Sequence, residues 1–278
     1  MRIQEEIITS RNNPKVKWAA SLASKKGRDA ERSFIAEGEK LTFEALEAHL
    51  PVTNIFISES KKCNLFDRLS EYLSDSFYKN TEVTVLSDGA FEKISTEKAP
   101  QGIISVIKYL DFFRDIGIIY KEEFSLDADE RIIILSSVRD PGNIGAVIRS
   151  AVAFGVDHIF ITADSADVYN PKTVRSAMGS LFRVKITVVG DVVSLIDALK
   201  SKGRRVFAAE LKDGARSLSE VGLLATDAVI IGNEGHGISK EVSSASSGSV
   251  YIPISKKTES LNASVAAAVF MWEQSKYF

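Results

Sequence analysis

An α/β fold built on a parallel sheet, preceded by a smaller α/β domain, is the fold class that the sequence predicts. Two observations carry this prediction. In the C-terminal half, short apolar runs alternate with helical patterns, which is typical of a parallel sheet covered on both faces. Between the halves, residues 109–130 mix aromatic and acidic residues without a clean period and end in an acidic run. We therefore predict domains at residues 1–110 and 131–278, joined by a linker at 111–130.

The C-terminal elements follow one another in regular order. β-Branched and apolar runs predict strands at residues 131–137, 158–162, 184–189, 205–211, 227–232 and 249–254. Helices are predicted at residues 140–155, 170–182, 192–203 and 261–276. The first of these helices has both ends marked, because Asp140 can cap it, Pro141 suits its first turn and Gly155 suits a left-handed stop.

The N-terminal elements are also mixed. The pattern predicts helices at residues 38–49 and 66–75, and strands at 54–58, 82–87 and 102–109. No internal repeat or low-complexity tract interrupts them. We expect a small α/β domain here.

Composition excludes several classes of protein. The chain has 278 residues and a net charge of −2, so a nucleic-acid site would have to be a local patch. A single cysteine, three histidines and the absence of HExxH or CxxC spacing make a disulfide impossible within the chain and a metal site unexpected. Without an apolar signal core or a run of roughly 20 apolar residues, we expect a soluble cytoplasmic protein with no membrane contact.

A local basic patch lies near the N-terminus. Residues 9–32 hold seven Lys or Arg against one Asp and one Glu. Arg11, Lys25, Lys26 and Arg28 are our candidate RNA contacts in this stretch, although a solvated helix face would give the same pattern.

The predicted helix at 140–155 carries one charge on its body. At 100° per residue, its apolar stripe comprises Ile144, Val147, Ile148, Ala151 and Phe154. Arg149 points away from that stripe, on a face made of Gly and Ala. A ligand, a loop or another subunit approaching this face would explain the pattern, and so would an ordinary surface arginine.

Two later stretches are also unusual. In VIIGNEGHG, residues 229–237, a strand runs into a glycine-rich loop that matches neither GxGxxG nor a Walker motif, so it is a tight turn or a ligand loop. Glu234 in this loop could be a catalytic carboxylate or could anchor an arginine. In KTESLNASVAAAV, residues 257–269, Ser260 or Asn262 can cap the last helix, whose small residues allow close packing.

Three segments together resemble the SpoU (TrmH-type) branch of the SPOUT RNA methyltransferases: RDPGNIGAVIRSAVAFGVDHIFI, AVIIGNEGHGIS and VYIPISKKTESLNASVAAAVF. Their order and spacing agree from Arg139 to Phe270, and NPKTVRSAMGSLFRV fits between the first and second. The stretch from Ser10 to Leu46 resembles the L30e-like substrate-binding domain that precedes many ribosomal-RNA members.

The resemblance implies a fold, a reaction and a set of residues. It implies a deep trefoil knot in a homodimer that transfers a methyl group from S-adenosylmethionine to a ribose 2′-hydroxyl of RNA. Backbone at Gly232, Ile252 and Leu261 would hold the cofactor. The implied catalytic residues are Arg149, as the group that helps to deprotonate the hydroxyl, with Asn143, Glu234, Ser260 and Asn262 as its polar partners.

One position departs from the family pattern, and the substrate stays open. Lys256, followed by Lys257, stands where the family commonly has Gly, which alters the expected loop. Ribosomal RNA is the expected substrate, with the large subunit favoured. The alternatives are the same reaction on tRNA, or a catalytically silent RNA-binding protein of the same fold.

Overall fold

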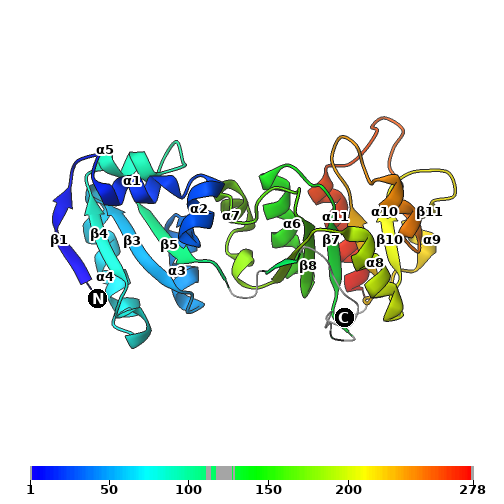
Figure 1. The fold of residues 1–278 in the computed structure, drawn as a ribbon, viewed down its shortest axis with the longest axis horizontal. Helices are drawn as coiled ribbons and strands as arrows, with labels where there is room; N and C mark the ends of the chain where they lie inside the picture. The colour runs from blue at the N-terminus through cyan, green and yellow to red at the C-terminus, as the bar shows by residue number, and fades with distance from the viewer. Residues whose placement is uncertain (1, 111–113, 117–126, 128, 277–278) are drawn as a thin grey trace. The chain divides into compact units, whose positions relative to one another are not determined.

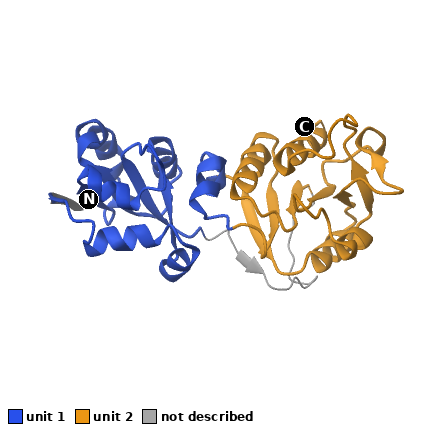
Figure 2. Ribbon diagram, turned by 90° about the horizontal axis from the view of Figure 1, so that it is seen from above, with its two compact units in different colours: residues 1–110, 167–182 blue, residues 111–166, 183–278 orange. Residues whose placement is uncertain are grey.

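The computed structural model describes residues 2–110, 114–116, 127 and 129–276. Its contacts divide the chain into two compact units (Figure 2): unit 1 comprises residues 1–110 and 167–182, and unit 2 comprises residues 111–166 and 183–278. The segment 167–182, which we had predicted as part of the C-terminal domain, therefore packs with unit 1. Most of the predicted linker lies outside the described residues.

Unit 1 is built on a five-stranded mixed sheet (Figure 1). Its strand order is β1 (Arg2–Ile8), β4 (Glu82–Leu86), β3 (Val52–Ser58), β5 (Ile103–Lys108) and β2 (Ser33–Glu37). The first three strands run parallel, and β5 is antiparallel to both of its neighbours. An α/β domain was predicted in this part of the chain, and the mixed sheet confirms that fold class.

Helices cover both faces of this sheet. One face packs through Ile35, Phe56 and Ile104 against α1 (Pro14–Ser21) and α5 (Asp88–Ile94). On the other face lie α3 (Glu39–Glu47) and α4 (Lys62–Leu73), and the Ser105 hydroxyl of β5 donates to Thr42 of α3 at 2.8 Å. Two further helices, α2 (Lys25–Glu31) and α7 (Pro171–Ala177), pack against β2.

Unit 2 contains the predicted parallel sheet. Its eight strands are all parallel, in the order β11 (Arg216–Ser217), β13 (Gly248–Tyr251), β10 (Val206–Ala209), β12 (Ala228–Ile231), β7 (Ile132–Leu135), β8 (His158–Thr162), β9 (Lys185–Val189) and β6 (Arg114–Ile116). Central strands buried on both faces read as unbroken apolar runs, which is why RIIIL and AVII could be recognised from sequence.

Two helix pairs cover the unit 2 sheet. Ile132, Ile134 and Ile230 share a core with α8 (Val192–Ser201) and α10 (Lys240–Ala245). The alternate residues Ile133 and Val229 are also fully buried, so both faces of the central strands are covered. The second pair, α6 (Pro141–Ala153) and α11 (Ala263–Ser275), pack on each other, and α11 also contacts β12.

The structure departs from the predicted elements in two ways. The helix predicted at 170–182 ends at Ala177, because Met178 and Gly179 both have positive φ, and a 3₁₀ turn follows at Ser180–Phe182. Short or weakly patterned elements were not predicted, namely β1, α1, α2, β2, α5, β6, β11, α9 (Leu218–Val221), α10 and the 3₁₀ turns Glu59–Lys61 and Ser76–Tyr78. Among the described residues, no helix has the length and apolar character that a membrane crossing requires.

Candidate active site

The start of α6 positions the first candidate residue. The Asp140 carboxylate accepts a hydrogen bond from the backbone N–H of Asn143 at 2.9 Å, and Pro141 occupies the first turn. At the other end, Gly155 has a φ of 66°, as predicted for a left-handed stop. This cap fixes where the chain turns into the helix, and it holds Asn143 just beyond the carboxyl end of β7.

A chain of hydrogen bonds joins three loops at this point. Asn143 Nδ2 donates to Glu234 Oε1 at 2.8 Å. Asn262 Nδ2 donates to Asn143 Oδ1 at 3.0 Å. Three segments widely separated in sequence therefore meet through their side chains, and the amide of Asn143 is oriented from both ends.

Glu234 anchors this chain as a carboxylate. Burial disfavours the charged form, but hydrogen bonds from Asn143 and from backbone N–H groups, including that of Arg139, outweigh it and hold the pKa of Glu234 below its ordinary value. The sequence left open whether Glu234 acts as a catalytic carboxylate or anchors an arginine. In the structure it binds the Asn143 amide. The backbone contribution of Arg139 was not predicted, since main-chain contacts leave no composition signal.

Asn262 is the cap of the last helix. Its Oδ1 accepts from the backbone N–H of Ser264 at 2.9 Å and from that of Val265 at 3.4 Å. The same side chain bonds Asn143 through its Nδ2. Ser260 lies outside the helix with an exposed side chain. Because one asparagine serves both the cap and the site, the polar start of α11 belongs to the site as well as to the helix.

Arg149 stands on the exposed side of α6. Its side chain makes no hydrogen bond or ion pair with any described residue. The predicted apolar stripe on the opposite side is buried at Ile144, Val147, Ile148 and Ala151. Phe154 was expected in that stripe but is only half-buried, and it lines a shallow apolar hollow with α11. Arg149 is thus available to a ligand, but no hydrogen bond joins it to Asn143, Glu234 or Asn262.

The three residues expected to hold the cofactor lie in two loops. Gly232 follows β12, and a Cβ built there would come within 2.6 Å of the Gly237 backbone. Asn233 and Gly237 pair across the turn, with the Asn233 N–H donating to the Gly237 carbonyl at 2.9 Å. Ile252 and Leu261 are half-buried in the loop between β13 and α11. Gly232 is therefore required by the packing of the turn, because Gly237 and Ile238 fill the space that a side chain would need.

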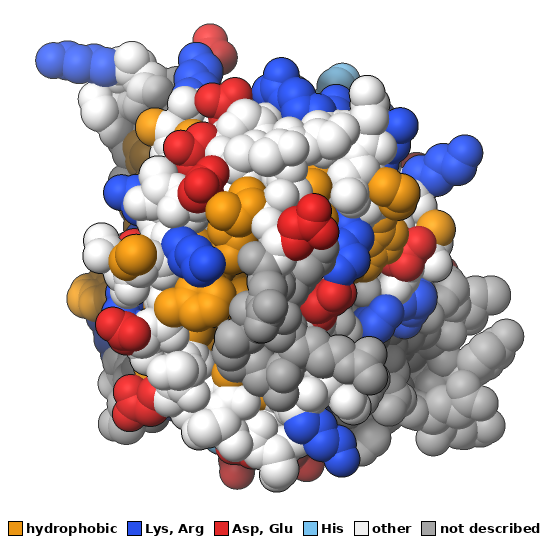
Figure 3. Space-filling view, turned by 90° about the vertical axis from the view of Figure 1, so that its left-hand side faces the viewer, with side chains coloured by type: hydrophobic (Ala, Val, Ile, Leu, Met, Phe, Trp, Pro, Cys, Tyr) orange, Lys and Arg blue, Asp and Glu red, His pale blue; other side chains and the backbone are white. Residues whose placement is uncertain are grey.

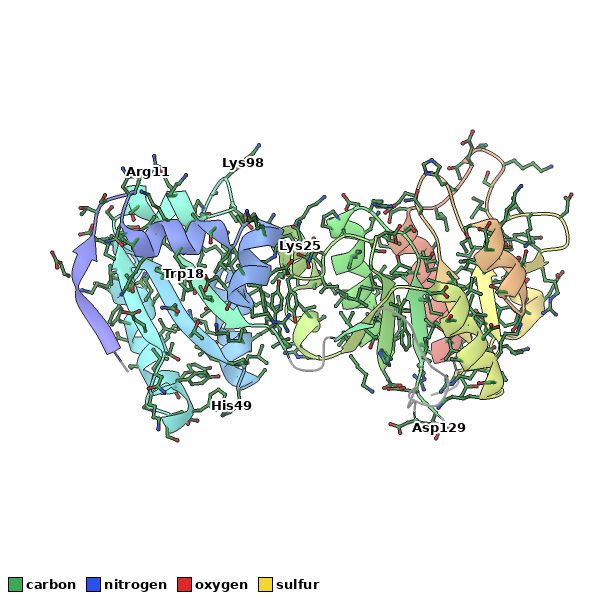
Figure 4. The ribbon with its side chains drawn as sticks, viewed as in Figure 1. Arg11, Trp18, Lys25, His49, Lys98 and Asp129 are labelled. Carbon is green, nitrogen blue, oxygen red and sulfur yellow. The ribbon has the colours of Figure 1, made fainter. Side chains whose placement is uncertain are left out.

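The basic residues of unit 1 divide into exposed and buried ones. Arg11 donates to the Gly89 carbonyl and pairs with Glu92, and Lys25 pairs with Asp29 four residues on. Lys26 is exposed. Figure 4 shows Arg11 projecting away from the ribbon, and Figure 3 shows charges of both signs interleaved on the end of unit 1 that it views. Any RNA contact here would therefore be local.

Arg28 does not occupy the surface position that we expected. Only 1% of the residue is exposed. Its guanidinium donates to the carbonyls of Leu22 and Ala23 and to Asp167 Oδ2 at 2.5 Å. A buried arginine bonded in this way holds α2 and the start of the α7 segment together, and we remove it from the RNA contacts.

Among the described residues, no group of three or more His, Cys, Asp or Glu is placed to hold a metal ion.

Comparison with known proteins gives the relatives of this chain. Residues 130–272 match the model of the SpoU rRNA Methylase family, and residues 13–105 match the MRM3-like substrate binding domain. A Bacillus subtilis (strain 168) protein named 23S rRNA (guanosine(2553)-2′-O)-methyltransferase RlmP is 31% identical, over 95% of this chain and 97% of its own length. A Streptomyces viridochromogenes protein named 23S rRNA (uridine(2479)-2′-O)-methyltransferase is 27% identical, over 96% and 90%.

Solved structures give the same answer for the fold. A putative RNA methyltransferase of the TrmH family from Porphyromonas gingivalis superposes with a TM-score of 0.77 and 29% identity, over 96% of this chain and 99% of that one. An rRNA methyltransferase from Sinorhizobium meliloti superposes with a TM-score of 0.82 and 24% identity, over 100% and 99%, a likeness of fold. With these matches, the fold is that of the SPOUT methyltransferase class. Within that class, the chain belongs to the SpoU rRNA methylase family.

Proposed function

We propose that this protein transfers a methyl group from S-adenosylmethionine to a ribose 2′-hydroxyl of RNA. The observation that carries the proposal is the chain Glu234–Asn143–Asn262, which joins the three family segments at one point. Ribosomal RNA is the proposed substrate, with the large subunit favoured, because the relatives named above act on 23S rRNA. A cytoplasmic location forms part of this proposal.

The hydrogen-bonded residues Glu234, Asn143 and Asn262 would act mainly by positioning the ribose hydroxyl. A hydroxyl held in line with its methyl donor gains up to roughly 7–11 kcal/mol of the barrier from proximity and orientation. Asn143, locked at both ends, offers a fixed amide to the ribose. Arg149 cannot lose a proton to water at neutral pH, because the pKa of a guanidinium exceeds about 12. It would instead stabilise the alkoxide that develops as the 2′-hydroxyl loses its proton to solvent.

Loop backbone would hold the cofactor. When bound, S-adenosylmethionine supplies a methyl group on a positively charged sulfur. The main chain at Gly232, Ile252 and Leu261 would bind it, and Ser260, exposed beside Leu261, would complete the polar rim. No metal is needed for this chemistry.

We also propose that the active protein is a homodimer joined through α6 and α11, with the deep trefoil knot of its family. A shallow hollow lies between these helices, and most of its surface is apolar. Its lining includes Ser150, Phe154, Val265, Ala268 and Trp272. Trp272 is 51% exposed and Val265 49% exposed. A second copy would cover this surface and would bring its own α6 close to Arg149.

We propose an N-terminal domain at residues 1–110, a linker at 111–130 and a catalytic domain at 131–278. The N-terminal domain would bind the RNA. Arg11, Lys25 and Lys26 are the proposed contacts. Charge contacts to phosphate make affinity fall with salt, so neutralising Lys25 and Lys26 together should weaken RNA binding and flatten its salt dependence.

Calorimetry with S-adenosylmethionine, followed by transfer of a labelled methyl group to rRNA and tRNA transcripts, tests the proposal. We expect cofactor binding, and ribose methylation of rRNA at one position that primer extension can map. A folded protein that binds RNA but neither binds the cofactor nor methylates either RNA would be a silent RNA-binding protein, and the proposal would be wrong. Methylation of tRNA alone would reject rRNA as the substrate.

A further inference from the structure

A pocket of about 510 Å³, lined by both polar and apolar groups, lies beside the candidate active site. It opens at the carboxyl ends of β7, β8, β9 and β12 and reaches the starts of α8 and α10. The strand order reverses between β7 and β12. On one side of this point lie β7, β8 and β9 in chain order, and on the other lie β12, β10 and β13. Open parallel sheets bind ligands at such a reversal, and the volume lies within the usual range for small-ligand sites.

The walls of the pocket are rigid and mixed in charge. Ser137 has a φ of 58°, uncommon for a residue with a side chain, and three hydrogen bonds hold it there. Its N–H donates to Thr162 Oγ1 at 2.8 Å, its hydroxyl to Asp164 at 2.7 Å, and its carbonyl accepts from Asn233 at 2.8 Å. Arg139 Nη2 pairs with the same Asp164 at 2.9 Å, yet 63% of the Arg139 side chain is exposed. Donors and acceptors are thus fixed at neighbouring points.

This chemistry suits a nucleobase better than a phosphate. A phosphate site gathers cations and N–H groups, whereas two carboxylates, Asp164 and Asp191, line this pocket with Arg139 and His236. A base edge presents both donors and acceptors, and an arginine fork matches the paired acceptors of a purine.

The pocket also shares a wall with the reaction site. The backbone N–H of Arg139 donates to Glu234 Oε2 at 3.3 Å, and Asn233, next to Glu234, is bonded to Ser137. The expected cofactor contacts Gly232, Ile252 and Leu261 do not line it. A base and its ribose are joined by a single bond, so a ribose at the Asn143–Glu234 pair leaves its base beside this pocket.

We propose that this pocket holds the base of the RNA nucleotide whose ribose is methylated, with Arg139 and Asp164 reading its edge. This inference rests on the proposed function and adds a specificity site to it. Arg139→Ala is the test variant. Arg183→Ala is the matched control, since Arg183 is an exposed arginine before the amino end of β9, at the opposite edge of the sheet.

The first experiment measures methyl transfer to RNAs that carry each of the four bases at the methylated position. Arg139→Ala should raise the KM for the preferred RNA roughly fivefold to a hundredfold. It should also reduce the differences in KM between RNAs that carry different bases at the methylated position. The Kd for S-adenosylmethionine and the salt dependence of RNA binding should match the wild type, because a base contact releases no counterions. Arg183→Ala should behave as the wild type throughout.

Three results would overturn the proposal. If Arg139→Ala and Arg183→Ala have the same KM and base preference, the pocket does not bind the base. If only the cofactor Kd rises, the pocket serves S-adenosylmethionine. If the salt dependence flattens by about one charge while base preference is kept, Arg139 contacts phosphate.

A second experiment separates this proposal from the proposed function. The ring of His236 lines the pocket, whereas His158 is buried and His49 lies in unit 1. With S-adenosylhomocysteine at saturation, titration of nucleoside 5′-monophosphates should shift the His236 NMR signals at similar concentrations in the wild type and in Arg183→Ala, but only at a roughly fivefold to hundredfold higher concentration in Arg139→Ala. This holds even if no RNA is methylated. Unmoved His236 signals in the wild type would count against the pocket, whatever the enzyme activity.

Discussion

Asn143 bonds in two directions, and each bond reaches a different loop. The residue type could be singled out from sequence because it stands one turn after a capped helix start, within a segment that resembles a known family. Its partners could not be found by spacing, since Glu234 is 91 and Asn262 is 119 residues away along the chain. The same limit explains why Arg28 was wrongly predicted to contact RNA. Its partner Asp167 is 139 residues away, so a basic stretch looked like surface where one side chain turns inward.

Arg149 carries the prediction that belongs to a single side chain. Arg149→Ala should lose methyl transfer by orders of magnitude, because an interaction made mainly in the transition state is removed. The Kd for S-adenosylmethionine should stay nearly unchanged, since loop backbone holds the cofactor. Arg149→Lys keeps the charge but not the planar fork, so it should restore little. Kinetics and calorimetry on folded, dimeric variants check this, and near-normal turnover in Arg149→Ala would make Arg149 structural.

At the level of helices and strands, buried elements were easier to predict than short ones. The central strands of unit 2 are apolar throughout and were found, whereas β1 (RIQEEII) carries charge and β11 has only two residues. Helix ends with a side-chain signal, Asp140 and Gly155, were also found. Met178 was missed because a left-handed conformation is rare for a residue with a side chain, and nothing in its residue type indicates it.

The loop after β12 gives a matched pair of glycine variants. Gly232→Ala places a methyl group within 2.6 Å of the Gly237 backbone, so the turn must open. The nearest atom to a Cβ at Gly235 is Asn233 Oδ1 at 3.6 Å, an ordinary contact. We expect Gly232→Ala to weaken cofactor binding at least tenfold and Gly235→Ala to leave it close to wild type, as measured by calorimetry. Equal affinities would mean that the turn does not shape the cofactor site.

The contact of α2 with the α7 segment gives a stability prediction. Arg28→Ala leaves Asp167 without its buried partner and should cost about 3–5 kcal/mol of the free energy of unfolding. Lys26→Ala, two residues away and exposed, should change it by less than about 0.5 kcal/mol. Urea denaturation measures both, and RNA binding by each variant shows which basic residue faces the substrate. A fully stable Arg28→Ala protein would contradict the buried pair.

At the scale of the whole chain, the sequence predicted two α/β parts and one parallel sheet, because alternation of strands and helices is visible without knowing any contact. The strand order was beyond it. Which strands become neighbours depends on pairings such as that of β7 with β12, far apart in the chain, and periodicity carries no information about them.

Assembly is the prediction for the whole molecule. Sedimentation at micromolar concentration should give twice the chain mass of 30.4 kDa. Trp272→Glu puts a charge into the apolar hollow and should yield monomers with little methyl transfer. Leu224→Glu alters an equally exposed apolar residue outside the hollow, 49% against 51%, and should remain dimeric. A Trp272→Glu monomer with full activity would exclude a shared active site.

The pairing of β7 with β12 also has a consequence for how the chain is made. During synthesis β7, β8 and β9 emerge in order and can pair at once, but β7 keeps an open edge until β12 has been translated. Parallel pairings between distant segments form slowly, since a long loop must close before any bond is gained. The growing chain therefore carries an unsatisfied apolar strand edge for much of its time on the ribosome, and we expect chaperones that bind such edges to engage it there.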